Sequence, residues 1–267
     1  MERICTYAVI PALDEERHIA RVISDVAPLV KGICVVDDGS KDCTAMFARK
    51  ALGAHTHLEI SEVTTGSGKG PGAAVRRGIE RLHALGVNEE HCCVIIDGDG
   101  QIPANIIPLA ADIVAQRNLG SVLVKGMRTY EGHSRAPRMR RWLGKWSAFA
   151  ASLALGEKIS DAHCGFAAAR LQTLVHLACK HPWDGYGYPA HWLLKQRQMG
   201  KGIEAISIPA HYGDETSTLR IHRLFLPLLR AYTLGILQRI LQACSRTKKE
   251  DHLPARVNTP IVETQMH

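Results

Sequence analysis

The sequence predicts an α/β fold in which helices flank a single, mostly parallel sheet. Short apolar runs alternate with helix-periodic segments over the first hundred residues, and this alternation is typical of βαβ units. Polar clusters follow three of the apolar runs, as expected for loops at the carboxyl ends of parallel strands. With 267 residues, 46% of them hydrophobic, the chain is long enough to bury a full core.

The expected elements follow one another closely. Strands are expected at residues 5–10, 33–36, 57–60 and 92–96. Helices are expected at residues 15–30, from Thr44 onward, and at residues 73–85, because apolar side chains recur there every three or four positions. A glycine-rich loop at residues 66–72 lacks the spacing of the common phosphate-binding motifs. By itself this loop is only a weak indication of phosphate binding.

Acidic side chains gather where the expected strands end. Asp97 and Asp99 follow the fourth strand, Asp37 and Asp38 end the second, and Glu15 follows the first. Carboxyl ends of parallel strands share one edge of a sheet, so these groups are expected to lie together. Carboxylates after the second strand can accept hydrogen bonds from a nucleotide base or ribose. A helix N-cap and a first-turn acid are the structural alternatives.

The Asp97–Asp99 pair is a candidate metal site, with Gln101 as a neutral oxygen donor. Mg²⁺ or Mn²⁺ suits a small oxygen site that leaves positions open for diphosphate oxygens. Such an ion offsets the charge that develops on a departing nucleotide. Taken alone, the Asp-Gly-Asp-Gly pattern favours a turn, so the metal interpretation rests on the neighbouring acidic clusters.

Positive charge is concentrated in one segment. The net charge is +7, and residues 121–150 hold seven Lys or Arg against one acid. A local patch of this kind favours one anionic ligand or an anionic membrane surface. A nucleic-acid partner is not expected, because the strand-end carboxylates would repel phosphates unless a cation intervenes.

Four segments, in this order, resemble the signatures of glycosyltransferase family 2. They are AVIPALDEE at residues 8–16, VVDDGSKDCT at 35–44, GKGPGAA at 68–74 and IDGDGQ at 96–101. The resemblance extends over about residues 5–220. It is greatest for the dolichol-phosphate mannosyltransferase and polyprenyl-phosphate glycosyltransferase branch, whose G-x-R and D-x-x-x-G-F landmarks match residues 126–128 and 161–166. It implies a GT-A type nucleotide-diphospho-sugar transferase fold and an inverting, metal-dependent transfer from a GDP- or UDP-sugar.

The resemblance also implies roles for individual residues. The metal and diphosphate would be bound by Asp97, Asp99 and Gln101, and the nucleotide pocket would be lined by Pro11, Glu15, Asp37 and Asp38, with Lys69 nearby. Arg128 and Arg140 would face the phosphate of an acceptor, such as a polyprenyl phosphate or a phosphate-bearing small molecule. Glu215 and Ser217 occupy the place where relatives close a loop over the donor. The expected catalytic groups are Asp99, Arg128 and Asp184.

The acceptor side departs from the family pattern. The polyprenyl branch has Ser where this chain has Gly144, and residues 183–191 lack the acidic pair that many relatives carry. Asp184 or His191 would then be the general base if the acceptor were a sugar or small-molecule hydroxyl, since a hydroxyl needs a base within hydrogen-bond reach. A phosphate acceptor needs no strong base, and the concentrated arginines favour it.

Two other classes of protein were weighed against this interpretation. A sugar-nucleotide nucleotidylyltransferase would need a Gly-rich, basic triphosphate loop after the first strand, whereas residues 11–16 are acidic and contain no glycine. A nonenzymatic phospholipid or nucleic-acid binder would explain the basic segment but not the three acidic clusters.

We expect a catalytic domain at residues 1–220, an amphipathic helix at 221–243 and a disordered polar tail at 244–267. Arg230 and Arg239 interrupt the apolar helix, so it is expected to lie on a membrane or to dock on the domain, and not to span a bilayer. The eight cysteines form no CxxC pair, which favours a reducing, cytoplasmic location. We therefore expect a cytoplasmic protein that binds peripherally to the cytoplasmic membrane face. Oligomeric state is left open.

Overall fold

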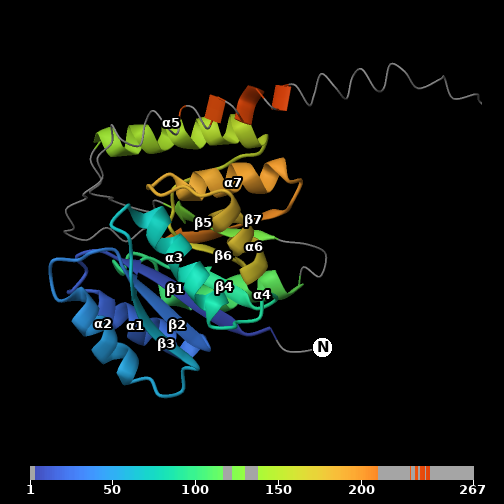
Figure 1. Cartoon of the computed structure of the whole chain (residues 1–267). Helices are drawn as coiled ribbons and strands as arrows, with labels where there is room; N and C mark the ends of the chain where they lie inside the picture. Colours follow the sequence, from blue (N-terminus) through green and yellow to red (C-terminus); the bar gives the residue numbers. More distant parts are fainter. Residues whose placement is uncertain are drawn as a thin grey trace, which may run out of the picture.

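The computed structural model describes residues 4–116, 122–129 and 138–209, together with helical positions between 229 and 240 (Figure 1). A seven-stranded sheet has the order β3-β2-β1-β4-β6-β5-β7. The strands are β1 (Thr6–Ala12), β2 (Gly32–Asp37), β3 (Ile60–Thr65), β4 (Cys92–Ile95), β5 (Leu123–Thr129), β6 (Ala167–Arg170) and β7 (Ile203–Pro209). Neighbours are parallel except at β6, which runs antiparallel to both β4 and β5. The predicted α/β class with a mostly parallel sheet is confirmed.

Helices cover both faces of the sheet. They are α1 (Ile19–Val26), α2 (Thr44–Gly53), α3 (Pro71–Ala84), α4 (Ile107–Gln116), α5 (Arg138–Leu155), α6 (Leu171–Val175) and α7 (Tyr188–Gln198), with short turns η1 (Ala27–Leu29), η2 (Ala104–Ile106) and η3 (His176–Lys180). Successive strand residues point to opposite faces, so Tyr7 and Val9 join one buried cluster and Ala8 and Ile10 the other.

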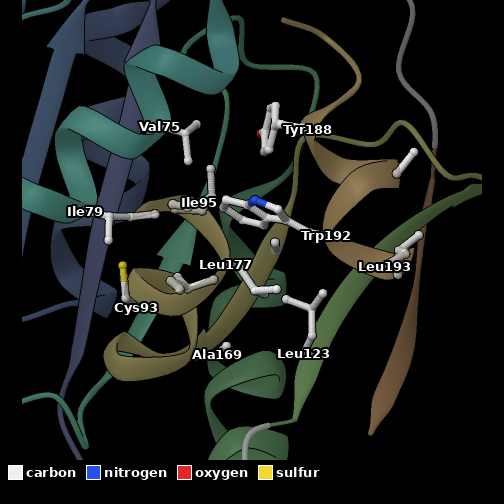
Figure 2. Packing of buried hydrophobic residues seen from close by; sticks show 14 of the residues in the cluster. Val75, Ile79, Cys93, Ile95, Leu123, Ala169, Leu177, Tyr188, Trp192 and Leu193 are labelled. Atoms are coloured by element: carbon white, nitrogen blue, oxygen red, sulfur yellow. The ribbon is translucent and has the colours of Figure 1, made fainter. Parts of the chain in front are cut away.

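The two clusters belong to different sets of helices. Figure 2 shows one cluster, in which Val75 and Ile79 of α3 lie at one side, Trp192 of α7 lies in the middle and Leu193 of α7 lies at the other side. The opposite cluster is built by α1, α2 and α4. Helix α3 approaches the sheet closely because Gly78 has no side chain; a Cβ there would lie 2.4 Å from Val9 Cγ1.

The third predicted strand was misplaced. The sequence favoured residues 57–60, but β3 runs from Ile60 to Thr65 and pairs only with β2. As an edge strand it is half-exposed, so its Ser, Glu and Thr residues lack the apolar signature of a buried strand. The first helix also begins later than predicted, at Ile19, since residues 15–18 form a turn.

The segment at 229–240 packs on the domain. A Cβ at Gly235 would lie 3.1 Å from Leu194 of α7 and 3.2 Å from Ala154 of α5, and Tyr232 is 1% exposed. Within the described part of the chain, no helix combines the length and apolar character that crossing a bilayer requires. The predicted tail at 244–267 lies outside the described residues.

Candidate active site

The loops after β1, β2 and β4 meet at one edge of the sheet. Residue pairing places Ala12 beside Asp37 in parallel register, and the backbone N–H of Asp38 donates to the Ala12 carbonyl at 2.9 Å. On the other side of β1, the N–H of Gly98 donates to the carbonyl of buried Pro11 at 3.0 Å. The three acidic clusters predicted from the sequence therefore lie on adjacent strand ends.

Asp97 sits in a niche left by a glycine. A Cβ at Gly165 would lie 1.9 Å from Asp97 Oδ2, so the backbone of Gly165 covers the carboxylate directly. Burial raises the pKa of Asp97, Asp99 raises it further, and Arg128 opposes this shift. Asp97 and Asp99 lie close together, and a bound cation would stabilise the charged form of both carboxylates.

Asp97, Asp99 and Gln101 supply few oxygen ligands at this edge of the sheet. Asp99 Oδ1 accepts the backbone N–H of Gln101 at 2.9 Å, and Gln101 is half-buried. Among the described residues, no group of three or more His, Cys, Asp or Glu side chains could hold a metal. One or two carboxylates completed by substrate phosphates and water are typical of Mg²⁺. The residues fit that kind of site.

Glu15 lies in a loop that hydrogen bonds hold to the segment after β2. Its backbone N–H donates to Thr44 Oγ1 at 2.7 Å, and its Oε2 lies 3.0 Å from His18 Nδ1. The preceding residue, Asp14, has φ of 57°, a conformation uncommon outside glycine, and its Oδ1 accepts the N–H of Lys41 at 2.7 Å. Because α1 begins only at Ile19, Glu15 is not a first-turn helix acid. Its charge is close enough to raise the pKa of Asp97.

Asp38 anchors the glycine-rich loop. Its two carboxylate oxygens accept the N–H groups of Gly68 at 2.8 Å and Gly70 at 3.0 Å. A Cβ at Gly66 would lie 2.4 Å from Asp38 Oδ1. This contact explains the glycine run without any phosphate-loop spacing. Lys69 is exposed in this loop, and its role toward the nucleotide stays a prediction, as does that of Asp38. Asp37 Oδ1 accepts the Ser40 N–H at 2.9 Å.

Arg128 is held by a second buried carboxylate. Its Nε donates to Asp161 Oδ2 at 2.5 Å and its Nη2 to Asp161 Oδ1 at 3.2 Å. Burial acts to raise the pKa of Asp161, but the attraction of Arg128 outweighs it and the pKa falls to about 2. Paired in this way, Arg128 is fixed in orientation beside Asp97.

Lys125 holds the segment of residues 161–166, which contains Asp161 and Gly165. Its buried Nζ donates to the carbonyls of Cys164 and Phe166, the latter at 3.1 Å. Tyr188, at the start of α7, donates through its hydroxyl to the Gly165 carbonyl at 3.3 Å. No role could be assigned to Lys125, Asp161 or Tyr188 from the sequence. The D-x-x-x-G-F spacing pointed to the segment, but the cations that hold it come from β5 and became visible only in three dimensions.

The two candidate general bases, Asp184 and His191, each contact another side chain of the protein. Asp184 Oδ1 accepts Arg76 Nη1 at 2.6 Å. The His191 ring lies 5.0 Å from that of Trp183, and burial lowers the pKa of His191 to about 4. A Cβ at Gly72 would lie 1.9 Å from the Trp183 carbonyl, so this loop is fixed against the start of α3.

Three predicted residues cannot be placed. Glu215 and Ser217 lie outside the described residues, as does the side chain of Arg140, whose backbone belongs to α5. Their assignment to donor and acceptor stays a prediction.

Comparison with known proteins agrees with this geometry. The family model described as "Glycosyl transferase family 2" matches residues 7–177, more than half of the chain. The chain belongs to glycosyl transferase family 2. It is therefore a glycosyltransferase. The dolichol-phosphate branch within the family is not distinguished by this match.

Individual relatives are more distant. An uncharacterized protein of Methanocaldococcus jannaschii is 28% identical over 218 residues, covering 78% of this chain and 89% of the relative. Glucosyl-3-phosphoglycerate synthase of Mycobacterium tuberculosis has a TM-score of 0.58 at 20% identity, with 91% of this family 2 chain and 80% of that chain covered. Staphylococcus aureus TarS has a TM-score of 0.56 at 17% identity, covering 88% and 66% of the two chains. These likenesses show the GT-A fold.

Proposed function

We propose that this family 2 enzyme transfers a sugar, with inversion, from a GDP- or UDP-sugar to a phosphate-bearing acceptor. The observation that carries the proposal is that an acidic site and a fixed arginine lie together at one edge of the sheet. Asp97 and Asp99 form an acidic site that suits a cation, and Arg128 is clamped next to it by Asp161. The acidic site with its cation suits the diphosphate of a donor, and the arginine suits a second anion.

The donor side is supported by the fit of the residues to a metal. Asp97, Asp99 and Gln101 would hold Mg²⁺ or Mn²⁺, and the ion would supply charge neutralisation on the departing nucleotide. The Mycobacterium tuberculosis synthase was crystallised with Mn²⁺ and UDP, and a Pyrobaculum calidifontis mannosyltransferase with GDP-Man and Mn²⁺. Glu15 and Asp37 lie at the same sheet edge, and in this proposal they would accept hydrogen bonds from the ribose or the base.

The acceptor side is supported by Arg128. An arginine that pairs with a carboxylate through Nε and Nη2 keeps its planar guanidinium in a fixed orientation, and a guanidinium of fixed orientation favours recognition of a phosphate. A phosphate oxygen is anionic at neutral pH and attacks the anomeric carbon without a strong base. The engagement of Asp184 with Arg76 and of His191 with Trp183 agrees with such an acceptor.

Three variants test the acceptor type. Arg128→Lys keeps the charge but loses the fork, so transfer should fall by roughly 10- to 100-fold, equivalent to about 1.5–3 kcal/mol. Donor binding and slow donor hydrolysis by water should be spared, because neither uses the acceptor. Asp184→Asn and His191→Ala should be mild by comparison.

Transfer and hydrolysis are measured side by side by chromatography of the labelled sugar. A mild Arg128→Lys combined with an inactive Asp184→Asn or His191→Ala would overturn the phosphate-acceptor proposal. It would instead favour transfer to a sugar or small-molecule hydroxyl.

The lipid form of the acceptor rests on an exposed apolar surface. Phe149 and Leu153 of α5 are 64% and 45% exposed, and Leu237 and Ile240 are 55% and 54% exposed. Lys158 and Arg239 line the hollow beside Phe149 and Leu153, together with one acid, Glu157. Apolar side chains flanked by cations suit the surface of an anionic membrane, so we propose peripheral binding there.

Flotation with anionic liposomes tests this surface. Binding should be seen at low salt and weaken as salt rises. A Phe149→Ser/Leu153→Ser double variant should bind less, whereas Leu109→Ser, an exposed residue on α4, should not change binding. Absence of flotation at low salt would leave a soluble phosphate-bearing acceptor, of the kind named for the phosphoglycerate synthase, as the proposal.

A further inference from the structure

The segment at residues 160–166 carries two groups that touch the site but has no regular secondary structure. Asp161 holds Arg128, and Gly165 covers Asp97. One backbone bond, from the Gly126 N–H of β5 to the Phe166 carbonyl at 3.1 Å, fixes its last residue, and side chains hold the rest. Lys125 and Tyr188 grip it near Gly165. Its Asp161 end is held by a different set of contacts.

A chain of buried hydrogen bonds reaches that end from the far side of α5. Tyr232, at the helical segment 229–240, has its hydroxyl 2.9 Å from Ser147 Oγ. Ser147 Oγ is in turn 2.6 Å from His163 Nε2. The His163 backbone N–H donates to Asp161 Oδ1 at 2.9 Å, the oxygen that also accepts from Arg128 Nη2. Tyr232 and Ser147 are 1% and 4% exposed.

The imidazole of His163 has little else to fix it. Its Nδ1 is buried and has no hydrogen-bond partner among the residues the structure describes. The bond from Nε2 to Ser147 is therefore the contact that sets the ring orientation in the described structure. Loss of that bond would remove the contact that ties His163 to α5, and with it the support of the residue whose backbone N–H holds Asp161 Oδ1.

We infer that Tyr232 is a positioning residue for Arg128, acting through Ser147 and His163. The packing of the 229–240 segment on α5 thus sets the geometry of the arginine that meets the acceptor. The effect on acceptor use rests on the proposed function; the effect on Arg128 itself does not.

Hydroxyl deletions test the chain. Tyr232→Phe and Ser147→Ala should each lower kcat/KM for a phosphate-bearing acceptor by about tenfold, the effect of losing one well-placed hydrogen bond. Binding of UDP or GDP with Mn²⁺ should stay within about twofold, since Lys125 and Tyr188 hold the Gly165 end of the segment independently of these hydroxyls. The matched control is Thr233→Ala. It removes a hydroxyl from the next residue, where Oγ1 donates to the Leu229 carbonyl at 3.0 Å, and it should behave as the wild type.

A double-mutant cycle separates positioning from general loss of stability. In an Arg128→Lys background, Tyr232→Phe should cause little further loss of transfer, because the group it positions is already gone. A merely structural role would lower transfer by the same factor in both backgrounds. Equal losses, or a Tyr232→Phe variant with wild-type kcat/KM, would overturn the inference.

A spectroscopic measurement needs no acceptor. The ¹⁵N–¹H signal of Arg128 Nε is assigned by its disappearance in Arg128→Lys, and it should shift or broaden in Tyr232→Phe but not in Thr233→Ala. An unchanged signal in Tyr232→Phe would overturn the inference. A shifted signal in a protein that uses no phosphate-bearing acceptor would uphold the positioning role and refute only the proposed acceptor.

Discussion

At the scale of single residues, the site depends on where a side chain is missing as much as on where one is present. Gly165 lets the backbone lie against Asp97, and Gly66 does the same for Asp38. The carboxylates could be identified from the sequence, because acids at strand ends share a sheet edge. Asp161, Lys125 and Tyr188 could not, because their roles come from contacts across 23 to 41 positions of the chain.

Gly165→Ala tests the niche around Asp97. The added Cβ would overlap Asp97 Oδ2, and relieving an overpacked contact of this kind costs about 1–3 kcal/mol. Displacement of the carboxylate should weaken Mn²⁺-dependent nucleotide binding by about 10-fold or more. Gly53→Ala is the control, since nothing lies within 4 Å of a Cβ at that position. Calorimetric titration with UDP and GDP measures both variants, and wild-type binding by Gly165→Ala would contradict the niche.

At the scale of elements, the predicted strand ends and glycine loop were right in kind, but some boundaries were not. Strand β3 was misplaced because its edge position leaves it polar and half-exposed. The loop at 66–70 was weighed as a phosphate-binding motif, whereas its shape is set by Asp38. The run of glycines indicates an unusual loop conformation. The residue that sets this conformation, Asp38, lies 30 and 32 positions before Gly68 and Gly70.

Asp38→Asn tests the anchoring of this loop. The amide keeps one acceptor oxygen, so one of the two N–H groups, of Gly68 or Gly70, loses its partner. The free energy of unfolding should fall by about 1–3 kcal/mol, and amide hydrogen exchange should quicken within residues 66–70. Urea denaturation and exchange mass spectrometry measure these effects. Asp25→Asn, at an exposed pair with Arg21, is the control. Unchanged exchange in Asp38→Asn would show that the loop holds its shape without the carboxylate.

At the scale of the whole molecule, the sheet class and the family followed from the order of motifs, since each sits at a strand end. The placement of the 229–240 segment on α5 and α7 did not follow, because its apolar pattern suits docking and membrane contact equally. Tyr232 is buried, whereas Leu237 and Ile240 are exposed. One face of this segment therefore packs on the domain, and another presents apolar side chains to the surroundings.

Buried histidines should make stability depend on pH. Burial lowers the pKa of His163 and of His191 to about 4, against about 6.5 in an unfolded chain. Below pH 6.5 these histidines take up protons in the unfolded chain but not in the folded one, so their contribution to stability is full above that pH and is lost toward pH 4. At pH 5 each histidine should cost about 2 kcal/mol.

Urea unfolding at pH 7.5 and pH 5.0 measures this loss. His191→Gln should reduce it by about 2 kcal/mol, while His83→Gln, on the exposed end of α3, should leave it unchanged. An equal loss in His191→Gln and the wild type would show that His191 does not contribute to the pH dependence.

The central claim is metal-dependent transfer from a nucleotide sugar to a phosphate-bearing acceptor. The most direct measurement is nucleotide release from a panel of GDP- and UDP-sugars, with Mn²⁺ or with a chelator. Each is assayed with paired acceptors that differ only in the phosphate: polyprenyl phosphate against polyprenol, and 3-phosphoglycerate against glycerate. We expect one donor to give release that needs the metal, is stimulated only by a phosphate-bearing member of a pair, and is abolished by Asp99→Asn. Release that survives the chelator and Asp99→Asn, or that is stimulated equally by both members of a pair, would contradict the account.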